Sequence, residues 1–228
     1  MVWFMKLKEV TNTNLKFLDS NESKCYFDKD RFYKIFKSNI DVEPRIEVIK
    51  TFLNNNIQGC PQLYEFIYDC DKVVGYSMEY YKKAISFSGK MRFEFVKKKC
   101  LELLYLYMQL KDRYDLCYAD FHNGNVCINN SSILLLDVDS CLIGKNINEN
   151  ITDKYLLDYI LSIIYNLSFF DCEVYFTQEE RKTIRDELYK NNDDTIKTVK
   201  DIEQFVSTVT KSDVKKVLKR IPYNIKNR

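Results

Sequence analysis

The alternation of hydrophobic and polar positions divides the chain into a first third that favours strands and a remainder that favours helices. Short apolar runs bounded by polar turns indicate strands over residues 15–18, 25–27, 31–36, 63–68 and 72–80. Between the third and fourth of these strands, apolar residues at 46, 49, 52 and 53 recur with the spacing of one helix face. Pro44 suits the first turn of this helix. The expected order is three strands of an antiparallel meander, one helix and two further strands.

After residue 93 the pattern changes to the spacing of a long helix. Its apolar face is formed by Val96, Cys100, Leu103, Leu104, Tyr107 and Leu110. Two short strands are expected over residues 126–128 and 133–136, and an apolar helix over 155–167. Further helices are expected over 179–189 and between 198 and 221. The predicted fold class is therefore α+β, with a strand-rich first part and a mainly helical second part.

The composition and charge fit a single globular domain. The chain has 228 residues, of which 46% are hydrophobic and 30% charged, and this balance is typical of a core under a solvated surface. The formal net charge of +2 argues against nonspecific nucleic-acid binding, so no nucleic-acid partner is expected. No uninterrupted apolar stretch of about 18 residues is present, so we expect no membrane-spanning helix.

Eight cysteines are spaced irregularly, without a C-x-x-C pair, and His122 is the only histidine. A structural zinc site is therefore not expected. The chain begins MVWFMKLKEV, in which the apolar run before Lys6 is too short for a secretory signal. These features favour a reducing, cytoplasmic location, and a disulfide-linked secreted domain is the alternative.

The segment YADFHNGNVCINNSSILLLDVDS, residues 118–140, concentrates groups suited to phosphoryl transfer. It contains Asp120, then Asn125, and finally Asp137 at the end of an apolar strand. Phosphoryl transfer needs a carboxylate beside the acceptor hydroxyl and oxygen ligands for the metal ions that neutralise the phosphates. The two short strands within the segment would bring Asn125 and Asp137 together.

The order of these residues resembles that of the protein-kinase-like superfamily. The loop YADFHNGN is similar to the D-x-H-x-G-N form of aminoglycoside and choline kinase relatives. This resemblance implies a two-lobed fold, with residues 1–81 as the amino-terminal lobe and 82–228 as a shortened carboxy-terminal lobe. It also implies ATP and Mg²⁺ as cofactors, Asp120 as the catalytic base, and Asn125 and Asp137 as metal ligands.

The same resemblance suggests roles for three further residues. His122 is similar to a histidine that braces the loop in the small-molecule branch of the superfamily. Asp139 stands at the glycine position of D-F-G. In an extended segment Asp137 and Asp139 would share a face, which predicts Asp139 as a second metal ligand; the alternative is a side chain that points to solvent. Asp158, a lone charge in an apolar helix, would brace the catalytic loop.

In the strand RFYKIFK, Lys34 matches the lysine of V-A-I-K, which neutralises nucleotide phosphates in kinases. Its flexible side chain needs a carboxylate partner, and we predict Glu47 of the following helix for this role. Glu43 is the alternative partner, although its place beside Pro44 favours a capping role. Lys37 is the rival lysine, and in an alternating strand it would face away from Lys34.

The other nucleotide contacts are predicted from a turn and from the fifth strand. No G-x-G-x-x-G loop is present, and DSNESK fills its place, so Ser20 and Asn21 would contact the phosphates from a less permissive backbone. Met78 would lie behind the adenine, and backbone groups of Glu79 and Tyr81 would meet its edge. The alternative is an ordinary edge strand with Met78 in the core.

The acceptor class is less determined than the nucleotide site. No A-P-E motif follows Asp139, so the long peptide-binding segment of eukaryotic protein kinases is missing or shortened. A Ser or Thr hydroxyl of a protein is the predicted acceptor, because little chain remains for the helices that enclose small acceptors. The alternatives are a small-molecule alcohol, AMP transfer, and a non-catalytic scaffold that uses the fold only for binding.

Overall fold

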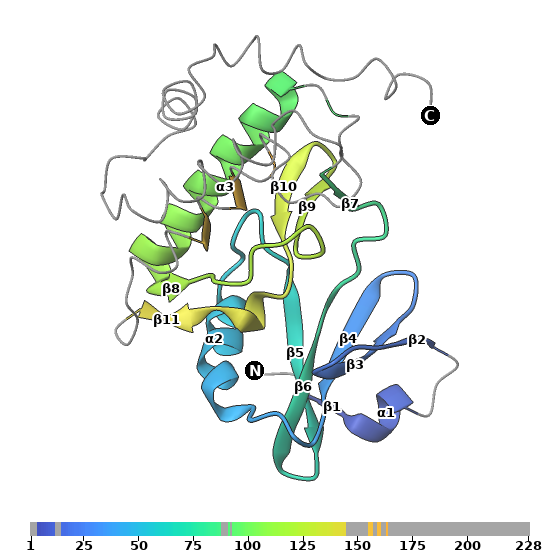
Figure 1. Ribbon diagram of the computed structural model, residues 1–228. Coiled ribbons are helices and arrows are strands. Elements are labelled where there is room, and N and C mark those ends of the chain that lie inside the picture. Colours follow the sequence, from blue (N-terminus) through green and yellow to red (C-terminus); the bar gives the residue numbers. More distant parts are fainter. Residues whose placement is uncertain are drawn as a thin grey trace.

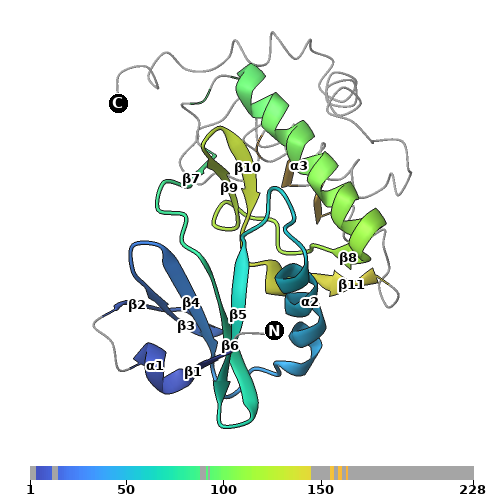
Figure 2. The same cartoon turned by 180° about the vertical axis from the view of Figure 1, so that it is seen from behind.

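The structure, a computed structural model, describes residues 4–11, 15–87, 91, 93–144, 155–156, 159–160 and 163. Its first part is a six-stranded sheet with a flanking helix, and its second part is built on a long helix and short strands (Figures 1 and 2). The fold class is therefore α+β, as the sequence predicts.

The first part is a mixed sheet. Its strands are β1 (Phe4–Lys6), β2 (Lys16–Asp19), β3 (Ser23–Phe27), β4 (Arg31–Phe36), β5 (Leu63–Asp69) and β6 (Lys72–Glu79). Their spatial order is β1-β5-β6-β4-β3-β2, and all neighbours pair antiparallel except β1, which runs parallel to β5. The five predicted strands are confirmed with small shifts at their ends. The additional strand β1 and the short helix α1 (Leu7–Thr11) are too short to give a periodic signal.

Strand β4 lies between β3 and β6, which places its middle residues at the centre of the sheet. Lys34 is paired with Cys25 on β3 and with Tyr76 on β6. A Cβ atom at Gly75 would collide with the carbonyl oxygen of Lys34. The glycine therefore lets β6 approach the backbone of β4 closely at the point from which Lys34 projects.

Helix α2 (Glu43–Asn54) packs against β5 and against η1, a 3-10 turn over Val138–Ser140. It buries Val48, Ile49 and Phe52, and Pro44 lies in its first turn as predicted. Figures 1 and 2 show α2 between the sheet and the strands of the second part. A residue on the appropriate face of α2 can therefore reach both parts of the molecule.

The long helix predicted after residue 93 is confirmed as α3 (Phe93–Tyr114). The short strands of the second part are β7 (Ile85–Ser86), β8 (Leu116–Cys117), β9 (Val126–Asn129), β10 (Ser132–Leu135) and β11 (Leu142–Ile143). The two predicted strands are confirmed as β9 and β10, which pair as an antiparallel hairpin; β7 pairs with β9, and β11 pairs with β8. The hairpin turn has positive φ at Asn130 and Ser131, and asparagine tolerates this conformation better than most residues.

One cluster of buried hydrophobic residues joins the two parts. It includes Phe52 of α2, Tyr76 of β6, Leu103 of α3 and Leu135 of β10. The chain crosses between the parts over residues 80–84. The predicted lobe boundary at Tyr81 falls in this connection, and we retain it as a proposal.

The described positions between 155 and 163 are helical, in agreement with a helix in that stretch. Asp158 and the helices predicted over 179–189 and between 198 and 221 lie outside the described residues. No helix in the described part of the chain is long and apolar enough to cross a membrane.

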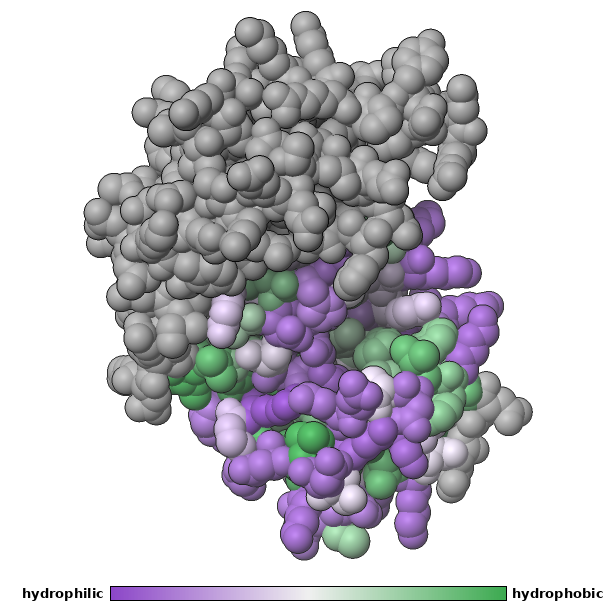
Figure 3. All heavy atoms as spheres, in the orientation of Figure 1, coloured by the Kyte–Doolittle hydropathy of each residue, from purple (hydrophilic) through white to green (hydrophobic). Residues whose placement is uncertain are grey.

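The described surface is mainly hydrophilic in the view of Figure 3, with apolar patches between the charged side chains. One patch lies over β2, where Phe17 and Leu18 are half-exposed. The Phe17 ring contacts that of Tyr26 on β3, with 5.1 Å between the ring centroids. Since β2 is the last strand of the sheet, this patch lies at its outer edge.

Candidate active site

A cleft of about 1450 Å³ lies where the sheet meets the second part. It is lined by the β2–β3 turn, β4, the end of β6, the start of α2, the loop before β9 and the segment from residue 136 to β11. The predicted site residues that line it are Ser20, Asn21, Lys34, Met78, Glu79, Tyr81, Asp120, Asn125, Asp137 and Asp139. Glu47 does not line the cleft. The structure thus brings most of the predicted site together from segments far apart in the chain.

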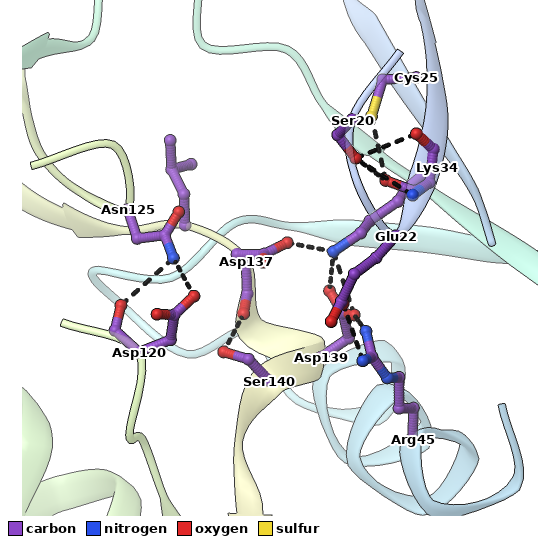
Figure 4. Close-up of polar contacts among 12 residues, drawn as sticks. Ser20, Glu22, Cys25, Lys34, Arg45, Asp120, Asn125, Asp137, Asp139 and Ser140 are labelled. Atoms are coloured by element: carbon purple, nitrogen blue, oxygen red, sulfur yellow. Dashed lines mark hydrogen bonds and ion pairs between the residues drawn. The ribbon is translucent and has the colours of Figure 1, made fainter. Parts of the chain in front are cut away.

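The buried side chain of Lys34 reaches from β4 across the cleft to two carboxylates (Figure 4). Its Nζ donates to Oδ1 of Asp137 and, at 2.9 and 3.1 Å, to both carboxylate oxygens of Asp139. Burial alone would lower the pKa of Lys34, but the charges of Asp139 and Asp137 outweigh it, and the pKa is raised. Lys34 is therefore a fixed positive charge within the cleft.

Asp139 accepts hydrogen bonds from three residues and is fully buried. Besides Lys34, its partners are the hydroxyl of Tyr76 at 2.6 Å and Nη1 of Arg45 at 2.8 Å. Burial alone would raise the pKa of Asp139, but the charge of Lys34 and the bond from Tyr76 outweigh it, so the pKa is lowered. These four bonds use both lone-pair positions of each carboxylate oxygen. Asp139 is thus an ionised carboxylate held entirely by the protein.

This geometry corrects the expectation for Asp139. The solvent-facing alternative is wrong, since the side chain is buried. The predicted role as a metal ligand is not supported either, because both carboxylate oxygens are occupied by hydrogen bonds within the protein. The argument from an extended segment fails because residues 138–140 form a 3-10 turn and Asp137 has a left-handed conformation with φ of 55°. Asp137 and Asp139 therefore approach Lys34 from different directions (Figure 4).

The predicted ion pair between Lys34 and Glu47 is wrong. Glu47 lies on the outer face of α2, where its side chain is 64% exposed and bonds Lys50 at 2.6 Å. The alternative partner, Glu43, is also exposed. The choice between the lysines is clear, because Lys37 pairs with Asp19, outside the cleft. Lys34 is the lysine of the cleft, and its partners come from the second part of the molecule.

Helix α2 contributes a cation to the cleft. Nη1 of Arg45 binds Asp139, and Nη2 binds Glu22 of the β2–β3 turn at 2.8 Å. Sequence reasoning does not identify Arg45 or Tyr76. The one available signal is the place of Arg45 in the first turn of a helix, where a positive charge opposes the helix dipole and calls for an anionic partner.

The loop between β8 and β9 presents Asp120 and Asn125. The backbone N–H groups of Asn125 and Val126 donate to the carbonyl oxygen of His122, which forms a tight turn. Nδ2 of Asn125 donates to Oδ2 of Asp120 at 2.8 Å. Nδ1 of His122 accepts the N–H of Gly124 at 3.0 Å, in line with the bracing role implied for it. Asp120 remains half-exposed at the cleft.

Asn125 and Asp137 meet because the β9–β10 hairpin brings the two ends of the motif together. The N–H of Leu136 donates to the carbonyl oxygen of Asn125 at 2.6 Å, so Asp137 follows directly beside the loop. Ser140 then donates its N–H and hydroxyl to the carbonyl oxygen of Asp137 at 3.1 and 2.7 Å. Burial and the neighbouring Asp139 carboxylate raise the pKa of Asp137.

The part of the cleft formed by the end of β6 contains the predicted adenine contacts. Met78 is buried at the cleft wall and is paired with Phe32 across the sheet. The N–H of Glu79 donates to the carbonyl oxygen of Gln62 at 2.9 Å. Because this N–H is already used, the backbone group of Glu79 that could meet the adenine is its carbonyl oxygen. Tyr81 also lines this part of the cleft.

The β2–β3 turn closes the cleft from the sheet side. The Ser20 hydroxyl bonds Ser23 within the turn, at 3.0 Å to its carbonyl oxygen and 2.9 Å to its hydroxyl. Asn21 and Glu22 also line the cleft. The phosphate contacts predicted for Ser20 and Asn21 remain predictions, and the turn that would make them is held to α2 through Glu22 and Arg45.

Comparisons with known proteins support the fold. No family model and no curated protein matches the sequence. Among solved structures, the Cydia pomonella granulovirus kinase PK-1 is similar, with a TM-score of 0.55 and 15% sequence identity over 84% of this chain and 93% of that chain. The comparisons do not extend to the narrower likeness to aminoglycoside and choline kinases. The chain has a two-lobed, protein-kinase-like fold.

Proposed function

We propose that this protein is a Mg²⁺- and ATP-dependent phosphotransferase that transfers the γ-phosphoryl group to a hydroxyl. One observation carries this proposal: the ammonium group of Lys34 and the carboxylate of Asp137 meet in a cleft that Asp120 also lines. A cation for the phosphates, an oxygen ligand for the metal and a base for the acceptor are the parts that phosphoryl transfer requires.

The oxygen donors beside the loop fit magnesium. Asp137 offers a partly exposed carboxylate, and Asn125 has its amide nitrogen committed to Asp120, which leaves its amide oxygen for a metal. No three His, Cys, Asp or Glu side chains of the described residues gather as a metal site. Mg²⁺ usually takes one or two protein ligands and completes its shell with phosphate and water. When bound, the ion would neutralise charge on the transferring phosphate.

Lys34 would bind the nucleotide phosphates. In the structure its Nζ is shared between Asp137 and Asp139. If Asp137 turns to a metal ion, Lys34 keeps its bonds to Asp139 and gains a free donor toward phosphate oxygens. Because the ammonium group is already fixed, little reorganisation is needed when charge develops on the phosphate.

Asp120 would orient the acceptor and receive its proton. Its side chain is half-exposed at the cleft, so a hydroxyl can reach it. The acceptor oxygen forms a bond to the γ-phosphorus while the bond to the bridging oxygen of ADP breaks, and the hydroxyl proton passes to the Asp120 carboxylate. Asn125 holds that carboxylate in place through its Nδ2.

A protein Ser or Thr hydroxyl is the acceptor that we favour. Leu142 and Ile143 of β11 line the cleft with partly exposed side chains, and apolar side chains at a cleft suit contact with a peptide chain. A small-molecule alcohol is the second candidate, favoured by the D-x-H-x-G-N form of the loop. A non-catalytic scaffold is the third, favoured by the serine-bonded turn that replaces a glycine loop.

Incubation with γ-labelled ATP and Mg²⁺ tests the proposal. We expect the wild type to transfer label to itself or to added proteins, and Asp120→Asn to bind ATP yet transfer label far more slowly. Label on small alcohols alone would select the second candidate. Binding of ATP without any transfer would select the scaffold, and wild type that neither binds ATP nor transfers label would overturn the proposal.

A further inference from the structure

Helix α2 carries no carboxylate toward the cleft, so Lys34 is anchored in another way. The two glutamates of its first turns, Glu43 and Glu47, are both exposed, and Arg45 occupies the face that meets the cleft. The anchor of Lys34 is Asp139, which belongs to the second part of the molecule. Helix α2 therefore contributes a positive charge at this place. In the kinase arrangement the helix contributes a negative charge, a glutamate that holds the lysine.

We propose that Arg45 is a positioning residue for the reaction, which acts through Asp139 to hold Lys34 in place for the nucleotide phosphates. This inference rests on the proposed function, since it names a residue that controls the geometry of the same site. Arg45 makes no contact with the reacting atoms in this scheme. Its effect passes through one buried carboxylate.

The contacts of Arg45 fix its guanidinium group on three sides. Nη1 binds Asp139 and Nη2 binds Glu22, each at 2.8 Å. The guanidinium carbon lies over the ring of Phe36, 5.2 Å from its centroid. A planar group held by two carboxylates and a ring has little freedom to move, and it constrains its partners in turn.

Asp139 needs this second cation because Lys34 is shared. In the structure Lys34 bonds Asp137 as well as Asp139, and the Asp139 side chain is fully buried. A buried carboxylate is stable only when its charge is compensated and its oxygens are hydrogen-bonded. Arg45 compensates the negative charge of Asp139 whether Lys34 turns toward Asp137 or toward a phosphate.

Arg45 also links Lys34 to two segments that border the cleft. Through Glu22 it is joined to the β2–β3 turn, and through its own backbone it belongs to α2. The turn, the helix and Lys34 thus share one set of ion pairs (Figure 4). A displacement of Lys34 by about 1 Å would lower the rate by roughly 100-fold, because phosphoryl transfer depends on placement.

The chain offers a matched control for a purely structural role. Arg31 pairs with Glu65 at 2.6 Å, and its guanidinium carbon lies 4.8 Å from the centroid of the Tyr64 ring. Like Arg45 it is held by a carboxylate and an aromatic ring, although it has one carboxylate partner where Arg45 has two, and it does not line the cleft. If Arg45 had only a structural role, replacing either arginine would change kcat and stability to a similar extent.

The first comparison is therefore Arg45→Met against Arg31→Met. Each change keeps an unbranched apolar stem and removes the charge. Transfer from γ-labelled ATP and thermal unfolding are measured on the full chain with Mg²⁺. We expect Arg45→Met to lower kcat on the order of 100-fold, with a smaller change in KM, and Arg31→Met to leave kcat near wild type. If Arg45→Met does not fold, Arg45→Lys replaces it, and the same loss of kcat in a folded protein is expected because a lysine lacks the forked geometry.

The second comparison relocates the charge. Arg45→Glu and Asp139→Gly are made singly and together. Each single change should lose most of kcat, whereas the double change puts a carboxylate on the helix and removes the buried one, so it should recover part of kcat. Equal kcat in Arg45→Met and Arg31→Met, or a double variant below both single variants, would overturn the inference. A wild type without any transfer is a different result, which overturns the proposed function and this inference with it.

Discussion

The two sides of the cleft are built in opposite ways. On one side, Lys34 and Arg45 both form ion pairs with the buried carboxylate of Asp139, which also accepts a hydrogen bond from Tyr76. On the other side, Asp120 is half-exposed; its carboxylate accepts a hydrogen bond from Asn125 at 2.8 Å and lies 3.6 Å from Nε2 of His122. The oxygens of Asp139 are fully hydrogen-bonded within the protein, whereas the carboxylate of Asp120 can still accept a hydrogen bond from another molecule.

This difference follows from the cost of burying charge. A buried carboxylate or ammonium group destabilises the fold unless partners and hydrogen bonds compensate it, so the buried side must be saturated. A catalytic base must be reached by its substrate and must keep a lone pair free. Asp137 stands between the two, since it bonds Lys34 but is about a third exposed and has a raised pKa. We expect substitutions on the buried side to lower stability, and substitutions on the open side to lower turnover alone.

The largest effect is expected for Lys34→Met. It leaves the carboxylates of Asp137 and Asp139 close together without their shared cation, and breaking a buried pair in this way costs about 3–5 kcal/mol. Turnover should fall by orders of magnitude as well. Urea unfolding and phosphate transfer measure the two losses. Adding Asp139→Asn should restore part of the stability and none of the turnover; no gain in stability would break the comparison.

The next effect is expected for Asp120→Asn, on the open side. Turnover should fall by about 10²–10⁴-fold, the usual contribution of a general base. Stability should change by less than about 0.5 kcal/mol, since the side chain is half-exposed. Thermal unfolding and transfer kinetics are measured on the same preparations. A large loss of stability would show that the two sides of the cleft are not separable.

A smaller effect is expected from pH. The pKa of Asp139 is lowered in the folded state, so its contribution to stability is complete above its unfolded pKa of about 3.9 and is lost as the pH falls through the folded value. Asp139→Asn should therefore be less stable than wild type near neutral pH and should approach it in strong acid. Unfolding curves recorded across the acidic range test this, and parallel curves at every pH would contradict it.

The smallest effect is expected for Glu22→Gln. The Glu22 side chain is about half-exposed, and such ion pairs contribute about 0–1 kcal/mol. Stability should therefore change little. Affinity for ATP should rise slightly, because a carboxylate at the border of the cleft no longer repels the phosphates. Isothermal titration with Mg²⁺-ATP gives the comparison, and weaker binding would show that Glu22 acts mainly through Arg45.

The sequence predicts the parts of this site that depend on local spacing. The hairpin of β9 and β10 joins Asn125 to Asp137 over a short stretch of chain, and the alternation of β4 separates Lys34 from Lys37. The rotation of α2 about its own axis is set by its packing against the rest of the molecule. The sequence alone therefore could not decide which residue of α2 meets the cleft. Residues two apart on a helix point in different directions, and Arg45 rather than Glu47 faces inward.

The role of Asp139 depends on backbone conformation in the same way. The left-handed conformation of Asp137 and the 3-10 turn after it direct Asp139 into the interior. A non-glycine residue with positive φ has no clear sequence signal. The pattern therefore predicts the residues that we propose to react, and the structure shows which residues hold them in place.

The central claim is that the cleft binds ATP together with a metal ion that Asp137 would help to hold. Its most direct test is isothermal titration of wild type and Asp137→Asn with ATP, in the presence and absence of Mg²⁺. The account predicts that Mg²⁺ strengthens binding to wild type and has little effect on Asp137→Asn, while both proteins remain folded. Equal binding with and without Mg²⁺ in wild type, or an undiminished effect of Mg²⁺ in Asp137→Asn, would contradict it.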